Sequence, residues 1–453
     1  MNLEVIILAA GQGTRMKSNI PKVLHGLAGK PMLEHVIDTA QKLDAANIHI
    51  VYGHGGEQVK THLIDHTLIW AEQAQQLGTG HAVQQAMPAI DNNSIVLILY
   101  GDVPLIRKET LQQLIGTVND KQMGLLTVKL GNPTGYGRIV RNESAQIEKI
   151  VEHKDASEAE HAIDEVNTGI MAVRSSELHK WLDRLDNKNV QGEYYLTDII
   201  EMAVADGIHV IGTCATDEIE VTGINDKVQL QIMERAYQRR QAENLMREGA
   251  TMMDAARFDL RGSCTIGKDV LFDVNIILEG KVTLGSHVSI GANVILKDAV
   301  IGDHVTILAN SVIDQAEVGS GSTVGPFARL RPDTVLAEET HIGNFVEIKK
   351  SSVGRGSKVN HLSYIGDSEI GKCVNIGAGT ITCNYDGANK YKTIIGDNAF
   401  IGSDSQLVAP VVIGAGATIG AGSTITKDTE ENKLTLSRSK QLSIEGWQRP
   451  QKK

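Results

Sequence analysis

The stretch Val288-Ser289-Ile290-Gly291-Ala292-Asn293-Val294-Ile295-Leu296 decides the fold of the C-terminal half, because it places large apolar residues six apart. The same step, shortened now and then to five, runs from Ile266 to Ile425, with one expected break between Ile376 and Ile395 that carries Asn384-Tyr385 on a loop outside the coil. The residue two places before each large one is small or β-branched, as at Ala328 and Ser363. Residues two apart share one face of a strand, so each hexapeptide predicts a short strand with one large and one small side chain inward, followed by a turn.

A register kept over about 160 residues predicts a repeat architecture. The pattern resembles the left-handed parallel β-helix, in which three hexapeptides form one coil, and the handedness comes from that resemblance. An all-β sandwich is the alternative, but its strands would be separated by turn signals every ~8–12 residues.

The length and composition of the whole chain limit the classes of protein to which it can belong. Its 453 residues exceed one compact core, and 42% hydrophobic with 22% charged residues is typical of a globular protein without membrane segments. A net charge of -11 argues against nucleic-acid binding. The apolar run from Val5 to Ala10 is too short to span a bilayer. Four cysteines without metal or disulfide spacing indicate a reducing, cytoplasmic location.

The N-terminal half alternates strand and helix patterns, which predicts a Rossmann-like α/β domain over residues 1–225. A connecting helix is expected at 226–249, ended by Gly249, and the β-helix domain with its tail at 250–453. The tail is expected to leave the repeat after Asp428. The expected strands are 5–10, 48–52, 94–100 and 125–130, and the expected helices are 31–43, 78–87, 107–119 and 197–206.

A glycine loop follows the first strand: Leu8-Ala9-Ala10-Gly11-Gln12-Gly13-Thr14-Arg15-Met16. Its glycines allow backbone N–H groups to approach a phosphate closely, although a plain tight turn is the alternative. It lacks the Gly-Lys-Ser/Thr of a P-loop and the third glycine of a dinucleotide fingerprint. Arg15 and Lys22 supply two cations that could meet a triphosphate.

This loop, with Pro21-Lys22 downstream, resembles the signature of the sugar-phosphate nucleotidyltransferases. The resemblance implies attack of a sugar-1-phosphate oxygen on the α-phosphorus of UTP, with Arg15 and Lys22 neutralising charge. It also implies nucleotide contacts from Leu8, Ala9, Ala10, Gly11, Gly13, Lys22, Gln73, Gly78, Thr79, Tyr100 and Gly101, and sugar contacts from Gly137, Glu152 and Asn167.

Asp102 follows the apolar strand Ile95–Leu99, and a carboxylate at a carboxyl strand end is well placed to hold Mg²⁺. Asn225 resembles the second metal ligand of the family. Either residue could instead cap a helix N-terminus.

In the repeat, Arg331 and Lys349 each come one residue after an interior position, and those positions lie one coil apart. The two cations should therefore stack on one outer face about 5 Å apart, where a sugar phosphate between them would relieve their repulsion. A solvated basic surface is the alternative. Glu347 and Tyr364 share that face. His361 occupies no interior position, so it is either a plain surface histidine or a functional one.

The whole chain resembles the bacterial bifunctional family of UDP-N-acetylglucosamine pyrophosphorylases that are also glucosamine-1-phosphate N-acetyltransferases. The segments 325–332, 344–350, 375–379 and 384–387 carry the resemblance. It implies that His361 is the general base, with Glu347 as a rival base or as a group that orients the imidazole. It implies acceptor contacts from Arg331, Lys349, Tyr364 and Asn375, and acetyl-CoA contacts from Ala378, Asn384, Tyr385, Ser403, Ala421 and Arg438.

The resemblance further implies a homotrimer without nucleic-acid or membrane partners, Mg²⁺ as cofactor, UTP and acetyl-CoA as co-substrates, and a product used for peptidoglycan and lipopolysaccharide. Two other interpretations stay open. The β-helix could be a non-catalytic scaffold on a monofunctional nucleotidyltransferase, or the chain could be a non-catalytic assembly protein. The cation pair, His361 and the Asn384-Tyr385 loop favour the bifunctional interpretation, since a scaffold needs none of them.

Overall fold

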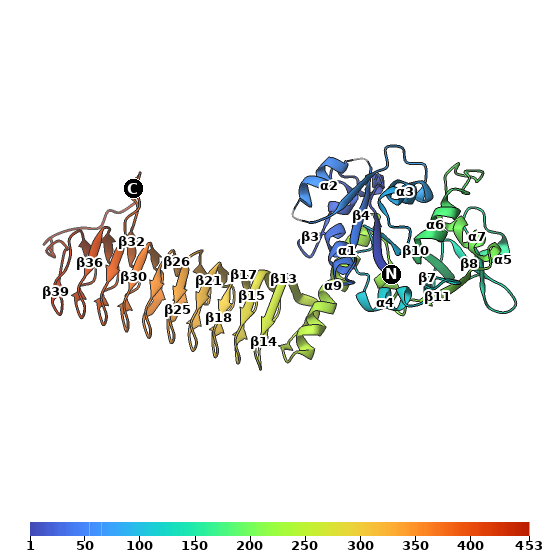
Figure 1. Cartoon of the computed structure of the whole chain (residues 1–453). Coiled ribbons are helices and arrows are strands. Elements are labelled where there is room, and N and C mark those ends of the chain that lie inside the picture. Colours follow the sequence, from blue (N-terminus) through green and yellow to red (C-terminus); the bar gives the residue numbers. More distant parts are fainter. Residues whose placement is uncertain (54, 65, 453) are drawn as a thin grey trace. The chain divides into compact units, whose positions relative to one another are not determined.

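The computed structural model describes residues 1–53, 55–64 and 66–452. The chain divides into two compact units, Met1–Tyr237 and Gln238–Lys453, each taken here by itself (Figure 1). Among the described residues, no helix is both long enough and apolar enough to cross a bilayer.

Unit 1 is built on one mixed sheet in the order β11-β7-β10-β6-β1-β4-β5. Strands β5, β4, β1 and β6 are parallel, whereas β10 runs antiparallel to both β6 and β7. A small antiparallel extension, β8 with β9, joins β10. The bounds are β1 (Asn2–Leu8), β4 (Asn47–Tyr52), β5 (Ile69–Glu72), β6 (Ser94–Tyr100), β7 (Gln122–Lys129), β8 (Arg138–Arg141), β9 (Ile147–Val151), β10 (Glu165–Arg174) and β11 (His209–Cys214).

Helices cover both faces of this sheet. Val5 and Ile7 pack on the face of α1 and α4, while Ile6 and Leu8 pack on the face of α3, α6 and α7. This alternation is the period of two that a strand buried on both sides requires. The Rossmann-like prediction is confirmed. The helices are α1 (Met32–Gln41), α2 (Gly56–His62), α3 (Thr79–Ala86), α4 (Lys108–Ile115), α5 (Glu158–His161), α6 (Ser175–Leu182), α7 (Ile199–Ala205) and α8 (Glu218–Val221).

Helix α9 (Lys227–Arg247) contributes to both units. In its first half, Met233 belongs to a small apolar cluster of unit 1 with Leu27 and Met32. In its second half, Leu245 joins the core of unit 2, and the Gln238 amide exchanges two hydrogen bonds with the Leu260 backbone. The two halves of the helix therefore bury apolar residues against different partners.

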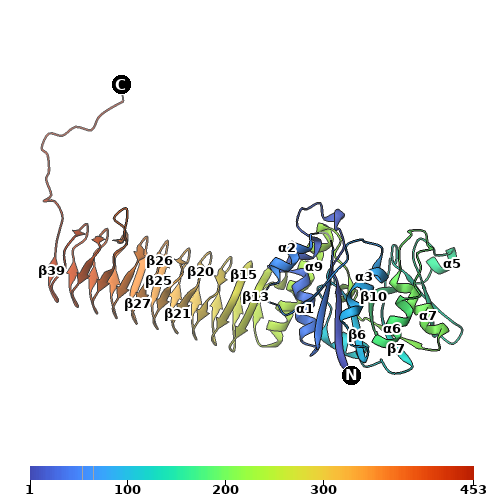
Figure 2. The same cartoon turned by 45° about the horizontal axis from the view of Figure 1, so that its top comes forward.

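Unit 2 is a parallel β-helix, as the repeat predicts (Figure 2). One face is an 11-stranded sheet from β12 (Thr251–Met252) to β39 (Leu434–Thr435), and the other strands form a 17-stranded sheet from β13 (Phe258–Ile266) to β38 (Thr424–Ile425). Successive coils are 17 or 18 residues apart, as the hydrogen-bonded ladder of Asn275, Asn293 and Asn310 illustrates. That spacing equals about three hexapeptides.

Two details of the repeat differ from the prediction. The expected break after Ile376 is shorter, because β32 (Ile381–Cys383) continues the coil with Thr382 fully buried, so only residues 384–392 leave it. The expected departure after Asp428 is wrong, because β39 pairs with β37 (Thr418–Ile419) and the Thr424 N–H still donates to the Ser437 carbonyl. Polar residues such as Thr382 occupy interior positions here, so a pattern based on apolar residues alone missed them.

Candidate active sites

The first candidate site lies at the carboxyl edge of the unit 1 sheet. Because β1, β4 and β6 are parallel, the loops that follow them emerge at the same edge. A cavity of about 240 Å³ opens there. The residues expected to contact nucleotide that line it are Leu8, Ala9, Ala10, Gly11, Lys22, Gln73, Gly78, Thr79, Tyr100 and Asp102.

Other expected residues of this site are not in the cavity lining: Gly13, Arg15, Gly101, Gly137, Glu152, Asn167 and Asn225. Conversely, Val23, Gln76, Ala82 and Glu193 line the cavity without having been predicted. The Gln76 amide donates a hydrogen bond to the Ala10 carbonyl and so ties this segment to the glycine loop. Gln76 could not be singled out from the sequence, because Gln75 beside it carries the same amide group.

The two glycines of the loop play different parts. A side chain at Gly11 would meet no atom within 4 Å, so its backbone is open to a ligand. Gly13 instead has a φ of 61°, and a Cβ there would lie 2.7 Å from Lys22 Cβ. Only glycine lets the Lys22 stem pack so closely while the backbone is left-handed. Gly13 thus serves mainly to place the lysine.

Asp102 and Asn225 come together although they are far apart in sequence. Lys22 Nζ pairs with the Asp102 carboxylate and donates to Asn225 Oδ1 at 3.2 Å, and Arg15 Nη2 donates to the same Oδ1 at 2.8 Å. The Ile224 N–H donates to the Asp102 carbonyl at 2.9 Å, which fixes the two segments side by side. Neither residue caps a helix. Asp226 caps α9 through the N–H groups of Val228 and Gln229.

The donor set at this point fits Mg²⁺. A carboxylate and an amide oxygen converge on one cationic group, the Lys22 ammonium, so the pair already attracts positive charge. Mg²⁺ prefers hard oxygen ligands and commonly takes one or two from the protein, with substrate phosphates and water completing the octahedron. No cluster of three or more His, Cys, Asp or Glu suited to a metal occurs in the part of the chain that the structure describes. Asp102 and Asn225 are therefore the residues that would hold this ion.

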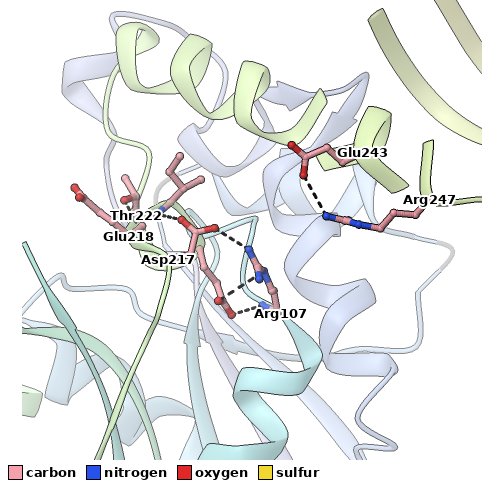
Figure 3. Close-up of polar contacts among 8 residues, drawn as sticks. Arg107, Asp217, Glu218, Thr222, Glu243 and Arg247 are labelled. Carbon is pink, nitrogen blue, oxygen red and sulfur yellow. Dashed lines mark hydrogen bonds and ion pairs between the residues drawn. The ribbon is translucent and has the colours of Figure 1, made fainter. Parts of the chain in front are cut away.

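An ion-pair cluster holds the same two segments a few residues away. Arg107 points toward Asp217, and its Nη2 lies 2.7 Å from the Asp217 carboxylate (Figure 3). The Arg107 backbone N–H also donates at 2.9 Å to Glu220, whose side chain is only 1% exposed. Asp102 precedes Arg107 by one short loop, and Glu220 precedes Asn225 in the same way. The cluster stabilises the loops on which both oxygen ligands sit.

Of the expected sugar-contacting residues, Gly137 directly precedes β8, Glu152 directly follows β9, and Asn167 lies in β10. The Asn167 N–H donates to the Gly137 carbonyl at 2.9 Å, and the Asn167 side chain accepts from the Gly169 N–H at 2.9 Å. Glu152 accepts from the Thr197 hydroxyl at 3.1 Å. Burial raises the pKa of Glu152, and that hydrogen bond opposes the rise. Thr197 was not predicted, because no motif in the sequence marks it.

The second candidate site draws on both sheets of the β-helix, and its cations lie on the outer face of the 17-stranded sheet. Leu330 pairs with Ile348, so Arg331 and Lys349 occupy equivalent places on successive coils, β23 (Arg329–Leu330) and β26 (Glu347–Lys349). Glu347 accepts from Arg331 at 2.8 Å and lies 3.9 Å from Arg329. Glu347 is thus held by two arginines.

A third cation, Lys390, belongs to the same group and was not predicted. It lies in the loop of residues 384–392 that leaves the coil, and the adjacent Lys349 ammonium lowers the pKa of Lys390. Lys349 thus has Lys390 beside it and Arg331 at the equivalent place on the preceding coil, an arrangement that favours an anionic ligand. The loop itself was singled out from the sequence, but nothing in its spacing indicated that Lys390 returns toward Lys349.

His361 ends β28 (Lys358–His361) and is exposed, as expected for a residue outside the interior positions. Its Nδ1 lies 2.9 Å from Asn344 Oδ1, so the partner of the imidazole is Asn344 and not Glu347. The strand register continues from β28 through β31 (Asn375–Ile376), β34 (Phe400–Ile401) and β37. Equivalent places on those coils hold small residues: Ala378, Ser403 and Ala421.

The remaining expected residues are distributed around this row. Arg438 Nη1 donates at 2.9 Å to the carbonyl of Ala421, the last residue of the row. Asn384 is buried and donates at 2.5 Å to Asp367, whereas Tyr385 is 60% exposed at the start of the loop. Tyr364 shares the face of Lys349, and Asn375 lies on the other sheet beside Lys358 and Phe400.

Three family models match parts of the chain. Residues 5–164 match the MobA-like NTP transferase domain, residues 260–353 match the GMPPB C-terminal domain, and residues 392–427 match the bacterial transferase hexapeptide, described as six repeats. The chain therefore joins an N-terminal nucleotidyltransferase domain to a C-terminal hexapeptide-repeat domain of the kind found in bacterial transferases.

Solved structures resemble mainly one half of the chain. A nucleotidyl transferase from Methanothermobacter is 16% identical, covering 53% of this chain and 99% of its own, with a TM-score of 0.39. A protein described as a glucose-1-phosphate thymidylyltransferase from Bacillus anthracis is 19% identical, covering 51% and 94%, with a TM-score of 0.41. A UDP-glucose pyrophosphorylase in complex with UDP-glucose is 16% identical, covering 52% and 98%, with a TM-score of 0.43. These values are too low to carry a conclusion about substrate.

Proposed function

We propose that the chain is a bifunctional enzyme of UDP-N-acetylglucosamine synthesis. Unit 2 transfers the acetyl group of acetyl-CoA to glucosamine-1-phosphate, and unit 1 transfers UMP from UTP to the resulting N-acetylglucosamine-1-phosphate with release of pyrophosphate. The observation that carries the proposal is the row of His361, Ala378, Ser403 and Ala421 on successive coils of a β-helix that also carries Arg331 and Lys349 on neighbouring strands. A scaffold would require neither the row nor the cations.

In unit 1, the chemistry is mainly positioning and charge neutralisation. The glycine loop presents its open backbone at Gly11 to the phosphates, and Lys22 and Arg15 meet the negative charge that shifts to the leaving pyrophosphate. A bound Mg²⁺ would supply further neutralisation of the α-phosphate. Gln73, held by hydrogen bonds to the Gly78 carbonyl and His81, is positioned to read the base.

On the sugar side of unit 1, Glu152 and Asn167 orient the acceptor hydroxyls. Tyr100 lies between the nucleotide and sugar residues, and Gly169 packs against its ring so closely that a Cβ would lie 2.5 Å from a ring carbon. This contact keeps the Tyr100 ring in one place. The acceptor phosphate oxygen can then attack the α-phosphorus from a fixed direction.

In unit 2, Arg331, Lys349 and Lys390 hold the phosphate of glucosamine-1-phosphate. The sugar ammonium gives one proton to solvent, and His361 takes a second proton from the nitrogen as the amine attacks the thioester carbonyl. The new C–N bond forms as the C–S bond breaks, and the imidazolium returns a proton to the departing CoA thiolate. The small side chains of Ala378, Ser403 and Ala421 leave space along the coil for the pantetheine arm, and Arg438 at the end of the row is available to its phosphates.

We also propose self-association through the β-helix, as a homotrimer. Support comes from an exposed apolar stripe on one corner of the coil, where the stacked rings of Phe327 and Phe345 are 49% and 55% exposed and Leu362 is 62% exposed. Surface apolar groups in such a contiguous row are typical of protein contacts. Sedimentation velocity of the parent chain and of Phe345→Asp checks this, and a monomeric parent chain would contradict it.

The decisive experiment gives the purified chain glucosamine-1-phosphate, acetyl-CoA, UTP and Mg²⁺, and identifies the products by mass. We expect CoA, pyrophosphate and UDP-N-acetylglucosamine. The scaffold alternative predicts nucleotidyl transfer only when N-acetylglucosamine-1-phosphate is supplied ready-made, with no CoA released. Replacing UTP by TTP or ATP in parallel tests the uridine preference.

A further inference from the structure

We propose that Asn344 is a positioning residue that sets the tautomer and the orientation of the His361 imidazole; this rests on the proposed acetyl transfer. Asn344 ends β25 (His341–Asn344), and the strand register pairs it directly with His361 on the next coil. The distance between Asn344 Oδ1 and His361 Nδ1 is 2.9 Å. The two side chains therefore occupy successive rungs of one ladder.

The direction of this hydrogen bond decides whether the imidazole can be a base. If Asn344 Oδ1 accepts, the ring proton sits on Nδ1 and the Nε2 lone pair is free to take a proton. If the amide were turned, its NH₂ would donate to Nδ1, the proton would sit on Nε2, and that nitrogen could not act as a base. The proposal commits to the first arrangement. Within the described residues, no hydrogen bond engages Nε2, which leaves it available to substrate.

Asn344 is the polar side chain suited to this role. Glu347, the carboxylate that could have oriented the ring, is held by Arg331 and Arg329. The ionisable groups on the paired strands are His341 and Lys358, which pair with each other three residues earlier, roughly 10 Å along the strand. On the following coil, β31 contributes Asn375, and Asp404 beyond it binds the Ala378 carbonyl through its backbone N–H.

The backbone at this corner is left-handed at three successive bulky residues, Phe327 and Phe345 at a φ of 56° and Leu362 at 49°. The last two directly follow Asn344 and His361. Other coils place Asn293, Asn310 or Gly379 at the same turn, residue types that adopt it readily. The Leu362 N–H donates to the Asn344 carbonyl at 3.1 Å, so the backbone also fixes this pair. Unfavourable backbone conformations kept at one place commonly accompany a functional site.

Two substitutions with opposite expectations test the proposal on the full-length chain. Asn344→Ala removes the acceptor, so kcat of acetyl transfer should fall roughly tenfold to a hundredfold, because the base is no longer held in place. Asn344→Asp keeps an acceptor, so it should recover most of kcat. Its carboxylate favours the imidazolium, so the acid limb of the pH profile of kcat should move up by about one unit.

Controls separate this role from a structural one. Asn293→Ala removes a surface amide from the same β-helix and should leave acetyl transfer unchanged. The affinity for acetyl-CoA, measured by calorimetry, and the uridylyl-transfer rate should stay at the parent values in every variant, which shows that both units are folded.

Two outcomes would overturn the inference while the proposed function stands. One is an Asn344→Asp variant as slow as Asn344→Ala, with an unshifted pH profile, which would mean that Asn344 donates to Nδ1. The other is a normal kcat in Asn344→Ala when His361→Ala is slow in the same assay. If His361→Ala itself is normal, the proposed acetyl-transfer mechanism fails first.

Discussion

The two candidate sites are assembled in opposite ways. In unit 2, Asn344, His361, Ala378, Ser403 and Ala421 are each the second residue after an interior position, and the strand ladder places them in one row. In unit 1, the pocket collects residues from the ends of separate strands at irregular spacings, and Lys22 and Asp102 at its edge meet Asn225 from the loop before α9. The first site is periodic in the sequence, and the second is not.

This difference has a physical origin. Each coil contacts mainly its neighbours, so a face of the β-helix is specified by a local repeat. The α/β unit instead brings distant segments together by burying both faces of a central sheet. We therefore expect a substitution in unit 2 to act on its own row, whereas one in unit 1 can disturb segments far away in sequence.

The largest expected effect tests whether distant oxygens form one centre. Asp102→Ala should slow uridylyl transfer on the order of 10⁴-fold, because several kcal/mol of charge stabilisation at the phosphate would be lost. Acetyl transfer should be unaffected. Both half-reactions are measured on the full-length variant across Mg²⁺ concentrations, with Asp183→Ala as a surface control. Normal uridylyl transfer at limiting Mg²⁺ would show that Asp102 holds no metal.

The next effect belongs to the row of unit 2. His361→Ala should lower kcat of acetyl transfer by about 10²–10⁴-fold, the usual range for a lost general base. Binding of acetyl-CoA and uridylyl transfer should change little, since the side chain is exposed. His341→Ala, a histidine on the preceding coil, is the matched control. Loss of both activities together would point to a structural histidine.

The third prediction concerns the stability of unit 1 after the loss of a buried or an exposed ion pair. Arg107→Ala removes the ionic partner of the buried Glu220 carboxylate and keeps only the backbone N–H bond to it, so the free energy of unfolding of unit 1 should fall by about 2 kcal/mol. Denaturant unfolding should show that loss in unit 1 and none in the β-helix. Arg184→Ala breaks an exposed pair with Asp206 and should cost at most about 1 kcal/mol. Equal losses in the two variants would contradict the importance given to burial.

The smallest effect is a pH dependence confined to unit 1. Burial, reinforced by Asp186 and Glu152, raises the pKa of Asp198 from 3.8 to about 6. Since the folded-state pKa is above the unfolded-state value, the stability linked to protonated Asp198 is lost as the pH rises through about 6. Asp198→Asn should therefore stabilise unit 1 by roughly 1 kcal/mol at pH 8, allowing for solvent screening, with the gap closing toward pH 4.

Asp206 provides a control of opposite sign for that measurement. Hydrogen bonds from Trp181 and Arg184 lower the pKa of Asp206, so its carboxylate stabilises the fold above its ordinary pKa. Asp206→Asn should lose stability at neutral pH, where Asp198→Asn gains it. Unfolding curves at pH 4, 6 and 8 compare the two, and a parallel response of both variants would show that the assignment of burial at Asp198 is wrong.

The parts of this protein that follow a period or a compact motif could be predicted from the order of its residues. The six-residue step specified the β-helix and the stacking of Arg331 on Lys349, because the strand ladder converts fixed spacing into fixed position. The glycine loop, with its cations and the aspartate after an apolar strand, indicated the nucleotide pocket, because parallel strands open their loops at one edge.

Contacts between irregular loops or polar side chains and residues distant in the sequence could be found only in the folded structure. Lys390 reaches Lys349 from an irregular loop, Thr197 supports Glu152, and Gln76 rather than Gln75 turns toward the glycine loop. The partner of His361 also depends on packing. Asn344 contacts the imidazole, because the Glu347 carboxylate is already paired with Arg331 and Arg329. In each case several polar groups could bind the same partner, and the packing of the folded chain determines which one does.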